Sequence, residues 1–223
     1  LVRAVIDASG RAGVIARQFG TRVTDPRLKN IAIYRHHKGV TRRQGRRAGD
    51  IRIIATPNGG WFWFIPITES VTSVGLVLPR DKYREAARNT PDETFDAIAS
   101  STPNVLRLLT HSTPITAARF ESDYSYLNSC QAGDRFVLVG DAGAFLDPIF
   151  STGVLLAMQS GIEAGQVVSD GLHKGDLSGK SFRKYEQQIV ARYKYFRQFA
   201  VGFYDQAFRE LFFSPSSRFG IFE

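Results

Sequence analysis

The sequence predicts a mixed α/β (α+β) fold, in which a block of antiparallel strands is inserted into a domain built of strand followed by helix. Four stretches with strand-like periodicity follow one another within residues 29–78. Short turns separate them, including Pro-Asn-Gly-Gly at residues 57–60, as is typical of hairpins. The flanking segments, residues 2–19 and 136–168, each combine one apolar strand with a helical pattern.

We expect strands at residues 2–7, 31–34, 51–54, 60–67, 72–78 and 136–139, and a pair of strands within 115–127. We expect helices at residues 11–19, 81–87, 90–99 and 104–109, another from about residue 152 onward, and helical structure over 177–213. The pattern predicts three regions: residues 1–28 with 128–175, residues 29–127, and a C-terminal helical segment at 176–223.

The composition predicts a globular protein of a reducing compartment. The chain has 223 residues, of which 43% are hydrophobic and 22% are charged, enough for one substantial core. No apolar run approaches the roughly 18 residues of a membrane span, and no secretory signal pattern opens the chain. The single cysteine, Cys130, excludes an internal disulfide framework and favours a cytoplasmic location.

The chain is basic, with a formal charge of +8, and its densest basic run lies at residues 35–47. Glycines and the lack of apolar periodicity predict that this run is an exposed loop or hairpin. It is either a solvated face or a surface that attracts an acidic partner. Nucleic acid is disfavoured because no aromatic side chains are interleaved for base stacking. The pair His36 and His37 has no carboxylate or cysteine company, so we expect no metal site.

The segment 136–153, with the sequence FVLVGDAGAFLDPIFSTG, contains the strongest functional pattern. A buried strand ends at Gly140-Asp141, and a helix begins near Thr152 after a loop of small residues. The Asp141 carboxylate can accept hydrogen bonds from ribose hydroxyls, and the helix start offers unpaired N–H groups with a positive dipole end. The pattern predicts a site for a polar cofactor. In the alternative interpretation, Asp141 caps the local structure only.

Three motifs give the chain a specific resemblance. Asp-Ala-Ser-Gly-Arg at residues 7–11, Trp-Phe-Trp-Phe-Ile-Pro at 61–66 and the run 140–153 occur in this order. They resemble motifs of the flavin-dependent halogenases, within the superfamily of FAD-dependent monooxygenases, and the resemblance covers about residues 5–160. It implies part of an FAD/NAD(P)-binding Rossmann-like domain at 1–28 and 128–175, with residues 29–127 as a sheet on the substrate side.

The resemblance also implies a partial chain. The G-x-G-x-x-G turn that opens a dinucleotide-binding unit is absent here, and in the family it precedes the Asp-Ala-Ser-Gly-Arg segment. The catalytic lysine of the family also lies in that earlier region. We therefore expect that the N-terminal flavin-binding portion is missing and that the fragment alone is inactive.

The site residues carried over from the family fall into three groups. The expected FAD-binding residues are Asp7, Gly10, Gly140, Asp141, Asp147, Pro148 and Gly153. The backbone of Thr152 and Gly153 is expected to bind a halide ion, and Trp61 and Trp63 are expected to line the flavin on the substrate side as part of the catalytic site. A buried sheet core is the alternative interpretation of the two tryptophans.

The implied reaction uses reduced FAD from a flavin reductase, oxygen, and chloride or bromide to halogenate an electron-rich substrate. Phe150 stands where halogenases of free tryptophan carry a glutamate. This favours a phenol- or pyrrole-like aromatic substrate, either free or tethered to an acyl or peptidyl carrier protein. The alternatives are an FAD-dependent monooxygenase, an oxidoreductase of the geranylgeranyl-reductase type and, more remotely, a basic nucleic-acid-binding module.

Aromatic residues recur at helical spacing between Phe182 and Phe212, and small residues recur similarly in the helix after Gly153. Both patterns are more often explained by close packing than by binding. We therefore assign function to the first turn of the helix after Gly153 and not to its body.

Overall fold

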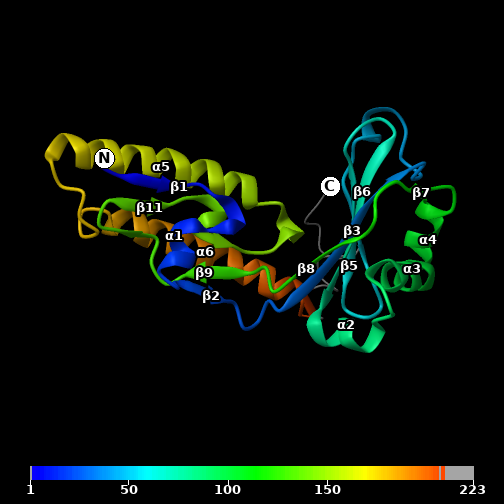
Figure 1. Cartoon of the computed structure of the whole chain (residues 1–223). Coiled ribbons are helices and arrows are strands. Elements are labelled where there is room, and N and C mark those ends of the chain that lie inside the picture. The colour runs from blue at the N-terminus through cyan, green and yellow to red at the C-terminus, as the bar shows by residue number, and fades with distance from the viewer. Residues whose placement is uncertain (1, 206, 209–223) are drawn as a thin grey trace. The chain divides into compact units, whose positions relative to one another are not determined.

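The computed structural model describes residues 2–205, 207 and 208. The chain forms two compact units, one from Leu1–Leu28 with Tyr124–Glu223 and the other from Lys29–Asp123. Figure 1 shows the elements of each unit. None of the described helices is long and apolar enough to cross a membrane.

The unit Lys29–Asp123 is built on a six-stranded antiparallel sheet with the order β4-β5-β6-β3-β7, in which β8 also pairs with β3. Its strands are β3 (Asn30–Lys38), β4 (Arg52–Ala55), β5 (Trp61–Pro66), β6 (Val71–Pro79), β7 (Thr113–Pro114) and β8 (Arg119–Ser122). Its helices are η2 (Gly45–Arg47), α2 (Arg80–Ala86), α3 (Pro91–Ser101) and α4 (Pro103–Leu109). The strands β3, β4, β5 and β6 lie where their sequence periodicity predicts them, to within a few residues at their ends.

One face of this sheet forms a closed hydrophobic core. Alternate residues of β3, β5 and β6 point to that face and pack against α3 and α4. The core includes Ile33, Phe62, Leu76, Phe95 and Val105. Helix α3 starts as the sequence predicts, because Thr90 accepts a hydrogen bond from the Glu93 N–H at 3.1 Å and Pro91 occupies the first turn.

The unit made of residues 1–28 and 124–223 contains two small sheets. In the first, with the order β1-β11-β10, β1 (Val5–Asp7) runs parallel to β11 (Phe136–Leu138), and β10 (Ala132–Gly133) is antiparallel to β11. The second, β12-β9-β2, is made of β12 (Ala144–Phe145), β9 (Tyr126–Asn128) and β2 (Arg22–Thr24). The register pairs Ile6 with Val137, which confirms that the first residues pack beside the 136–139 strand.

Two long helices cover this unit's core. They are α5 (Gly153–Lys174) and α6 (Arg183–Phe203), and both pack on Val137 of β11 through side chains such as Ala164 and Tyr185. Figure 1 shows β1 and β11 running alongside α5. The short elements are α1 (Val14–Gln18), η1 (Gly10–Ala12), η3 (Gly140–Ala142) and η4 (Pro148–Phe150). The predicted mixed α/β class, with an antiparallel sheet and C-terminal helices, is confirmed.

Two expected elements are wrong in detail. The strands within 115–127 do not pair with each other, because β8 joins β3 while β9 pairs with β2 and β12. The unit boundary between Asp123 and Tyr124 separates them. The segment 177–182 is not helical, and α6 starts only at Arg183. The last part of the expected helix, residues 209–213 with Phe212, lies outside the described residues.

The aromatic residues of the last helix are only partly core. Phe182, Tyr185, Tyr193 and Phe203 are buried, as their spacing predicts. Tyr195 and Phe199 are instead exposed. The packing interpretation therefore holds for one face of the helix.

The basic run is not a loop throughout. Arg35 and His37 belong to β3 and are buried, since both point to the face of the sheet that α3 covers. Arg35 donates to Asp92 at 2.6 Å and to Asp96, and its guanidinium lies over the Phe95 ring. The expectation of an exposed loop is therefore wrong for these two residues, because acidic side chains from α3 neutralise the buried cation.

The same contacts fix the protonation state of His37. The Arg35 Nε–H donates to His37 Nε2 at 3.0 Å, so this ring nitrogen must accept. The other nitrogen, Nδ1, then carries the proton toward Ser112 Oγ at 3.1 Å. Burial, followed by the charge of Arg35, lowers the pKa of His37 to about 4, although Asp96 opposes the shift.

Candidate functional site

The turn after β11 is pressed against helix α5. Gly140 has φ +53°, in the left-handed region that glycine adopts readily, and its N–H donates to Ser160 Oγ at 2.8 Å. A Cβ on Gly140 would lie 2.9 Å from the Ala157 Cβ. Both the backbone angle and the close approach therefore require glycine at this position.

Asp141 follows directly and has an available carboxylate. Its backbone carbonyl accepts from the Tyr126 hydroxyl at 2.6 Å, which fixes the turn. Within the described part of the chain, no donor is hydrogen-bonded to the side chain. Burial raises the pKa of the carboxyl, and Arg11 partly offsets the shift. A partly buried acceptor that the fold does not use itself suits a ligand hydroxyl.

Asp147 and Pro148 shape the next turn. Asp147 is buried, and its two carboxylate oxygens accept from the Ile149 N–H and the Tyr204 hydroxyl, both at 3.0 Å. Pro148 occupies the first position of η4, where a missing N–H is tolerated. These two residues therefore hold the loop that leads to α5.

Helix α5 begins with unpaired backbone donors. Ser151 has φ +52°, Thr152 is the N-cap residue without a side-chain cap, and Gly153 is the first helical residue. Among the described residues, no acceptor is hydrogen-bonded to the N–H of Thr152 or Gly153. Gly153 is exposed, and a Cβ there would meet nothing within 4 Å. The start of this 22-residue helix therefore offers open donors and a positive dipole end to an anion.

Asp7 and Gly10 form the turn after β1. The Asp7 carboxylate accepts from the Ser9 N–H at 2.9 Å, the Ser9 hydroxyl at 2.5 Å and the Ile15 N–H at 2.8 Å. Burial raises the pKa of Asp7, but these hydrogen bonds outweigh it and the net shift is downward. Gly10 has φ +65°. Asp7 thus ties β1 to the start of α1 and keeps no oxygen free of local donors.

Trp61 and Trp63 belong to the other unit, on β5. Their spacing predicts a common face, and the rings are 5.9 Å apart with an interplanar angle of 51°. Trp61 is 1% exposed, whereas Trp63 is half-buried. The Trp63 Nε1–H donates to Ser73 Oγ at 3.2 Å. The pair lies on the sheet face opposite Phe62 and Phe64, which face the helix-covered core.

Phe150 makes apolar contacts with α6. Its ring meets Phe199 and Phe203 of α6 edge-on, with centroids 6.3 and 6.2 Å away. The residue before Ser151 therefore stabilises the packing of η4 on α6 and brings no carboxylate to this loop.

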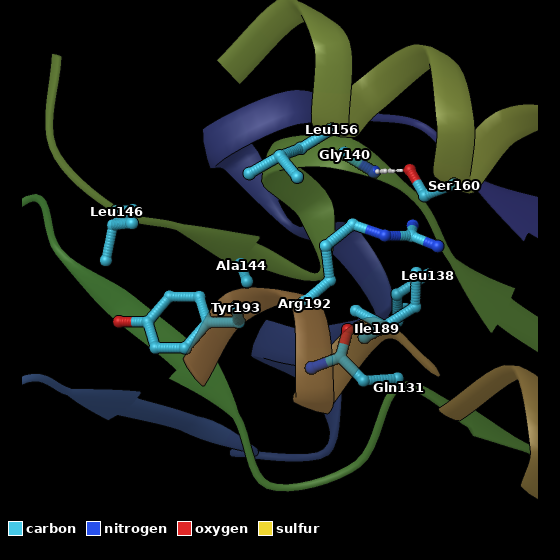
Figure 2. A pocket seen from close by; sticks show the side chains of 10 residues that line it. All are labelled: Gln131, Leu138, Gly140, Ala144, Leu146, Leu156, Ser160, Ile189, Arg192 and Tyr193. Carbon is cyan, nitrogen blue, oxygen red and sulfur yellow. Dashed lines mark hydrogen bonds between the residues drawn. The ribbon is translucent and has the colours of Figure 1, made fainter. Parts of the chain in front are cut away.

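Behind the Gly140 turn lies a small cavity that the sequence did not indicate (Figure 2). Its volume is about 40 Å³. Figure 2 shows that Gln131 and Arg192 are among its lining side chains, and the Gln131 Oε1 and Arg192 Nη1 atoms are buried without a hydrogen-bond partner. The cavity has room for a water molecule and is too small for a cofactor. No pattern in the sequence could have linked Gln131 to a residue of the last helix.

The fold places the chain in a class of flavoproteins. It superimposes on CmlS, a flavin-dependent halogenase, with a TM-score of 0.81 and 32% identity, over 90% of this chain and 36% of that one. It superimposes on the flavin-dependent brominase Bmp2 with a TM-score of 0.85 and 25% identity, over 98% of this chain and 56% of that one.

Sequence relatives give the family. The chain is 34% identical over 206 residues to the 1H-pyrrole-2-carbonyl-(peptidyl-carrier protein) chlorinase of Pseudomonas fluorescens, covering 90% of this chain and 45% of the relative. It is 32% identical over 194 residues to the sulochrin halogenase of Aspergillus terreus, covering 83% and 35%. The tryptophan halogenase family model matches residues 2–212. The chain belongs to the tryptophan halogenase family, whose members include flavin-dependent halogenases, and spans less than half the length of these two relatives.

Proposed function

We propose that the chain is part of an FAD-dependent halogenase that uses reduced flavin, oxygen and chloride or bromide to halogenate an electron-rich aromatic substrate. Bound FAD would supply the oxidising chemistry. The observation that carries the proposal is the loop 140–153, which lies between a buried strand and a long helix. Its first turn has the Asp141 carboxylate, to which no described donor is hydrogen-bonded, and its end has the unpaired N–H groups of Thr152 and Gly153. The family match favours halogenation over the hydroxylase, the geranylgeranyl-type reductase and the nucleic-acid-binding alternatives.

In this proposal the residues of the loop divide the work of holding FAD. Asp141 accepts hydrogen bonds from a ribose or ribitol hydroxyl, and Gly140 lets the turn approach α5 closely enough to present it. Asp147 and Pro148 fix the path of the loop. Asp7 and Gly10 contribute through the turn after β1, since the Asp7 oxygens are engaged by Ser9 and Ile15.

The halide site that we propose consists of the N–H groups of Thr152 and Gly153. Backbone N–H groups at a helix N-terminus bind anions, and they do not titrate as a charged side chain does. Gly153 has open space around its Cα, so a cofactor ring can approach the donors. For Trp61 and Trp63 we propose the role that the family motif implies, which is to line bound flavin on the substrate side.

A substitution at Asp141 tests the cofactor assignment. In the intact enzyme, Asp141→Ala should weaken FAD binding by about ten- to a hundredfold, because a hydrogen bond to a charged group contributes roughly 1.5–3 kcal/mol. Asp134→Ala is a control, since its Oδ1 accepts from the exposed Gly179 N–H and lies outside the loop. Unchanged FAD affinity in a folded Asp141 variant would contradict the assignment.

A pair of substitutions at Gly153 tests the halide site. Gly153→Pro removes one N–H at a helix position that tolerates proline, whereas Gly153→Ala keeps the N–H and its Cβ meets nothing within 4 Å. The proline variant should lose chloride-dependent product while it still consumes oxygen and releases peroxide, and the alanine variant should retain product. Circular dichroism must accompany the test, because proline disfavours the helical angles of Thr152. Equal chlorination by both variants would place the halide elsewhere.

The partner that we propose is an acidic carrier protein that presents the substrate. Two relatives act on pyrrole-2-carbonyl groups held on a peptidyl carrier protein. Residues 38–52 of this chain carry six basic side chains, of which only Arg43 is ion-paired, to Asp50 at 3.2 Å, within the described structure. We call this stretch the basic segment. Its exposed Arg46 and Arg47 would add attraction to an acidic surface.

The basic segment is held in place by one of its own arginines. Arg42 donates five hydrogen bonds to the turn between β5 and β6, reaching Thr68, Glu69, Val71 and Thr72. Its neighbours are thereby presented on an ordered loop. Burial lowers the pKa of Arg52, Arg43 and Arg107 lower it further, and Asp50 partly offsets the shift.

The carrier proposal is tested by charge reversal. In the intact enzyme, Arg46→Glu with Arg47→Glu should raise the KM for a carrier-tethered pyrrole substrate and reduce its salt dependence, without changing kcat. The exposed pair Arg183→Glu with Lys184→Glu carries the same charge change on α6 and is the control. Equal effects of the two pairs would show that only net charge matters. The flavin reductase and the cytoplasmic location expected from the sequence stay predictions.

A further inference from the structure

Trp63 lies directly on a glycine of the neighbouring strand. The register of β5 and β6 places Gly75 opposite Trp63, and Gly75 in turn faces Tyr34 of β3. A Cβ built on Gly75 would lie 2.1, 2.2 and 2.4 Å from the Cζ2, Cε2 and Cη2 atoms of the indole. The benzene half of the indole therefore occupies the space of the missing side chain and lies flat across the sheet.

Two further contacts hold the ring in this orientation. Ser73, two residues before Gly75 on the same face, accepts the indole N–H at 3.2 Å. The Tyr34 ring lies 5.8 Å from the Trp63 ring and limits its movement toward β3. The contact with Gly75, the hydrogen bond to Ser73 and the neighbouring Tyr34 ring together restrict the orientation of the indole.

We call Gly75, on which the indole lies, the seat of Trp63. The neighbouring Trp61 has no such seat. Trp61 lies opposite Val77 and Ala55, which both have side chains, and it is 1% exposed. Trp63 lies opposite glycine and is half-buried. Glycine inside a strand contributes no side-chain packing and is entropically unfavourable. Because the adjacent position of the same pair of strands tolerates valine, the glycine at 75 serves the position of Trp63.

We propose that Gly75 and Ser73 are positioning residues that set the depth and orientation of the Trp63 indole, and thereby the shape of the aromatic wall on the substrate side of the flavin. This inference rests on the proposed function. A side chain at position 75 would have to lift the indole by roughly 1 Å or more to restore ordinary carbon–carbon contact. The displaced indole would then change the shape of the aromatic surface that Trp61 and Trp63 form.

The seat can be tested without any activity. The chain has two tryptophans, and rings 5.9 Å apart at 51° are close enough for their electronic transitions to couple in circular dichroism. Gly75→Ala should change the coupled signal strongly, and Ser73→Ala should change it more weakly. Gly49→Ala is the matched control in the same unit, because a Cβ there meets nothing within 4 Å. A spectrum of Gly75→Ala that equals the parent's would overturn the inference.

A second arm guards against unfolding and tests function. Gly75→Ala combined with Trp63→Phe removes the atoms that collide, so it should recover the thermal midpoint that Gly75→Ala alone loses. If the midpoint does not recover, Gly75 is not the seat of Trp63.

In the intact enzyme, Gly75→Ala should lower halogenated product per oxygen consumed at least about tenfold, with FAD affinity unchanged. An unchanged ratio, despite an altered spectrum, would overturn the link from seat to wall. A parent enzyme without chloride-dependent product would instead refute the proposed function and leave the seat standing.

Discussion

The two units of the chain differ in how completely they bury their apolar side chains. In the unit Lys29–Asp123, one face of the sheet is closed by α3 and α4, and its core residues are almost fully buried. In the other unit, helix α5 exposes a row of apolar residues: Val154, Leu155, Met158 and Ile162. Val5 and Ile6 of β1 are also more than a third exposed. A contiguous exposed apolar patch can mark an interaction site or favour aggregation.

Because of this difference, we expect the two units to differ in how independently they unfold. The sheet unit closes its own core and should unfold cooperatively by itself. The other unit has a core between β11, α5 and α6, but it leaves one side of α5 and β1 uncovered. Both tryptophans lie in the sheet unit, so their fluorescence reports on that unit separately from the helical signal.

The largest expected effect breaks the closed core. Phe62 is fully buried and meets Phe95 edge-on at 5.4 Å, so Phe62→Ala should destabilise the sheet unit by about 3–5 kcal/mol. Urea unfolding followed by tryptophan fluorescence measures the loss. Val154→Ala, on the exposed row of α5, should change the stability of the helical unit by less than about 0.5 kcal/mol, as measured by the helical signal in circular dichroism. Similar losses in the two variants would show that the row on α5 is as well packed as the core.

The second effect is acid destabilisation of the sheet unit through His37. Its pKa is about 4 in the folded state and 6.5 as the ordinary value. Between these values the unfolded state binds the proton and the folded state does not, so stability falls as the pH falls from about 6.5 to 4. The loss should reach at most about 3 kcal/mol, at roughly 1.36 kcal/mol per unit of pKa. It is measured by urea unfolding at a series of pH values.

The control for this pH effect is a histidine that is exposed to solvent. His173→Gln, at an exposed position on α5, should leave the pH dependence unchanged, whereas His37→Gln should flatten it. A slope between pH 6.5 and 4 that survives in His37→Gln would contradict the assignment of the acid sensitivity to His37.

The third effect loosens the helical unit. Asp25 is buried and accepts two hydrogen bonds from Arg197 of α6, which ties the end of the N-terminal segment to that helix. Burial raises the pKa of Asp25, but Arg197 and the other donors outweigh it. Arg197→Met leaves this carboxylate without its main partner and should cost about 2 kcal/mol, measured by the helical signal in circular dichroism. Lys194→Met, exposed on the same helix, should be neutral.

The smallest effect on stability concerns the exposed row itself. Ile162→Glu should change the unfolding free energy by no more than about 0.5 kcal/mol, because the side chain is already in water. It should nevertheless reduce self-association of this chain in light scattering, since it interrupts the apolar row. Gln159→Glu adds the same charge at an exposed polar position and should not. Equal scattering by both variants would show that the row does not drive association.

The strands of the sheet unit were predictable because hairpin pairing is local. Each strand between residues 30 and 79 carries its own periodicity, and the hairpins β4-β5 and β5-β6 each close through a short turn. The pairing of β3 with β6 was not local, because the other two strands lie between them in the chain. The start of α5 at Gly153 and the turn at Gly140 were predictable for a similar reason, because glycine signals act over a few residues. The cofactor and halide assignments on this loop stay predictions until they are tested.

The sequence could not show which charged side chains are buried. Arg35 and His37 look like part of an exposed basic run, and only the packing of α3 on β3 brings Asp92 and Asp96 to them. The separation of β8 from β9 had the same origin, since strand partners distant in the chain decide which sheet each strand joins. The Asp7 and Asp141 carboxylates also looked equivalent, yet local donors surround the first and none is hydrogen-bonded to the second in the described structure.

The sequence by itself determined the mixed α/β class, the hairpin block, the helix boundaries set by caps and the family motifs, because each depends on residues close together in the chain. The tertiary structure alone decided that Gly75 seats Trp63, that His37 is neutral and that α5 keeps an apolar row exposed. These features depend on side chains brought together by strand register and helix packing. Contacts between distant residues leave no periodic trace in a single sequence, and the physical reason is that burial and hydrogen bonding depend on three-dimensional neighbours.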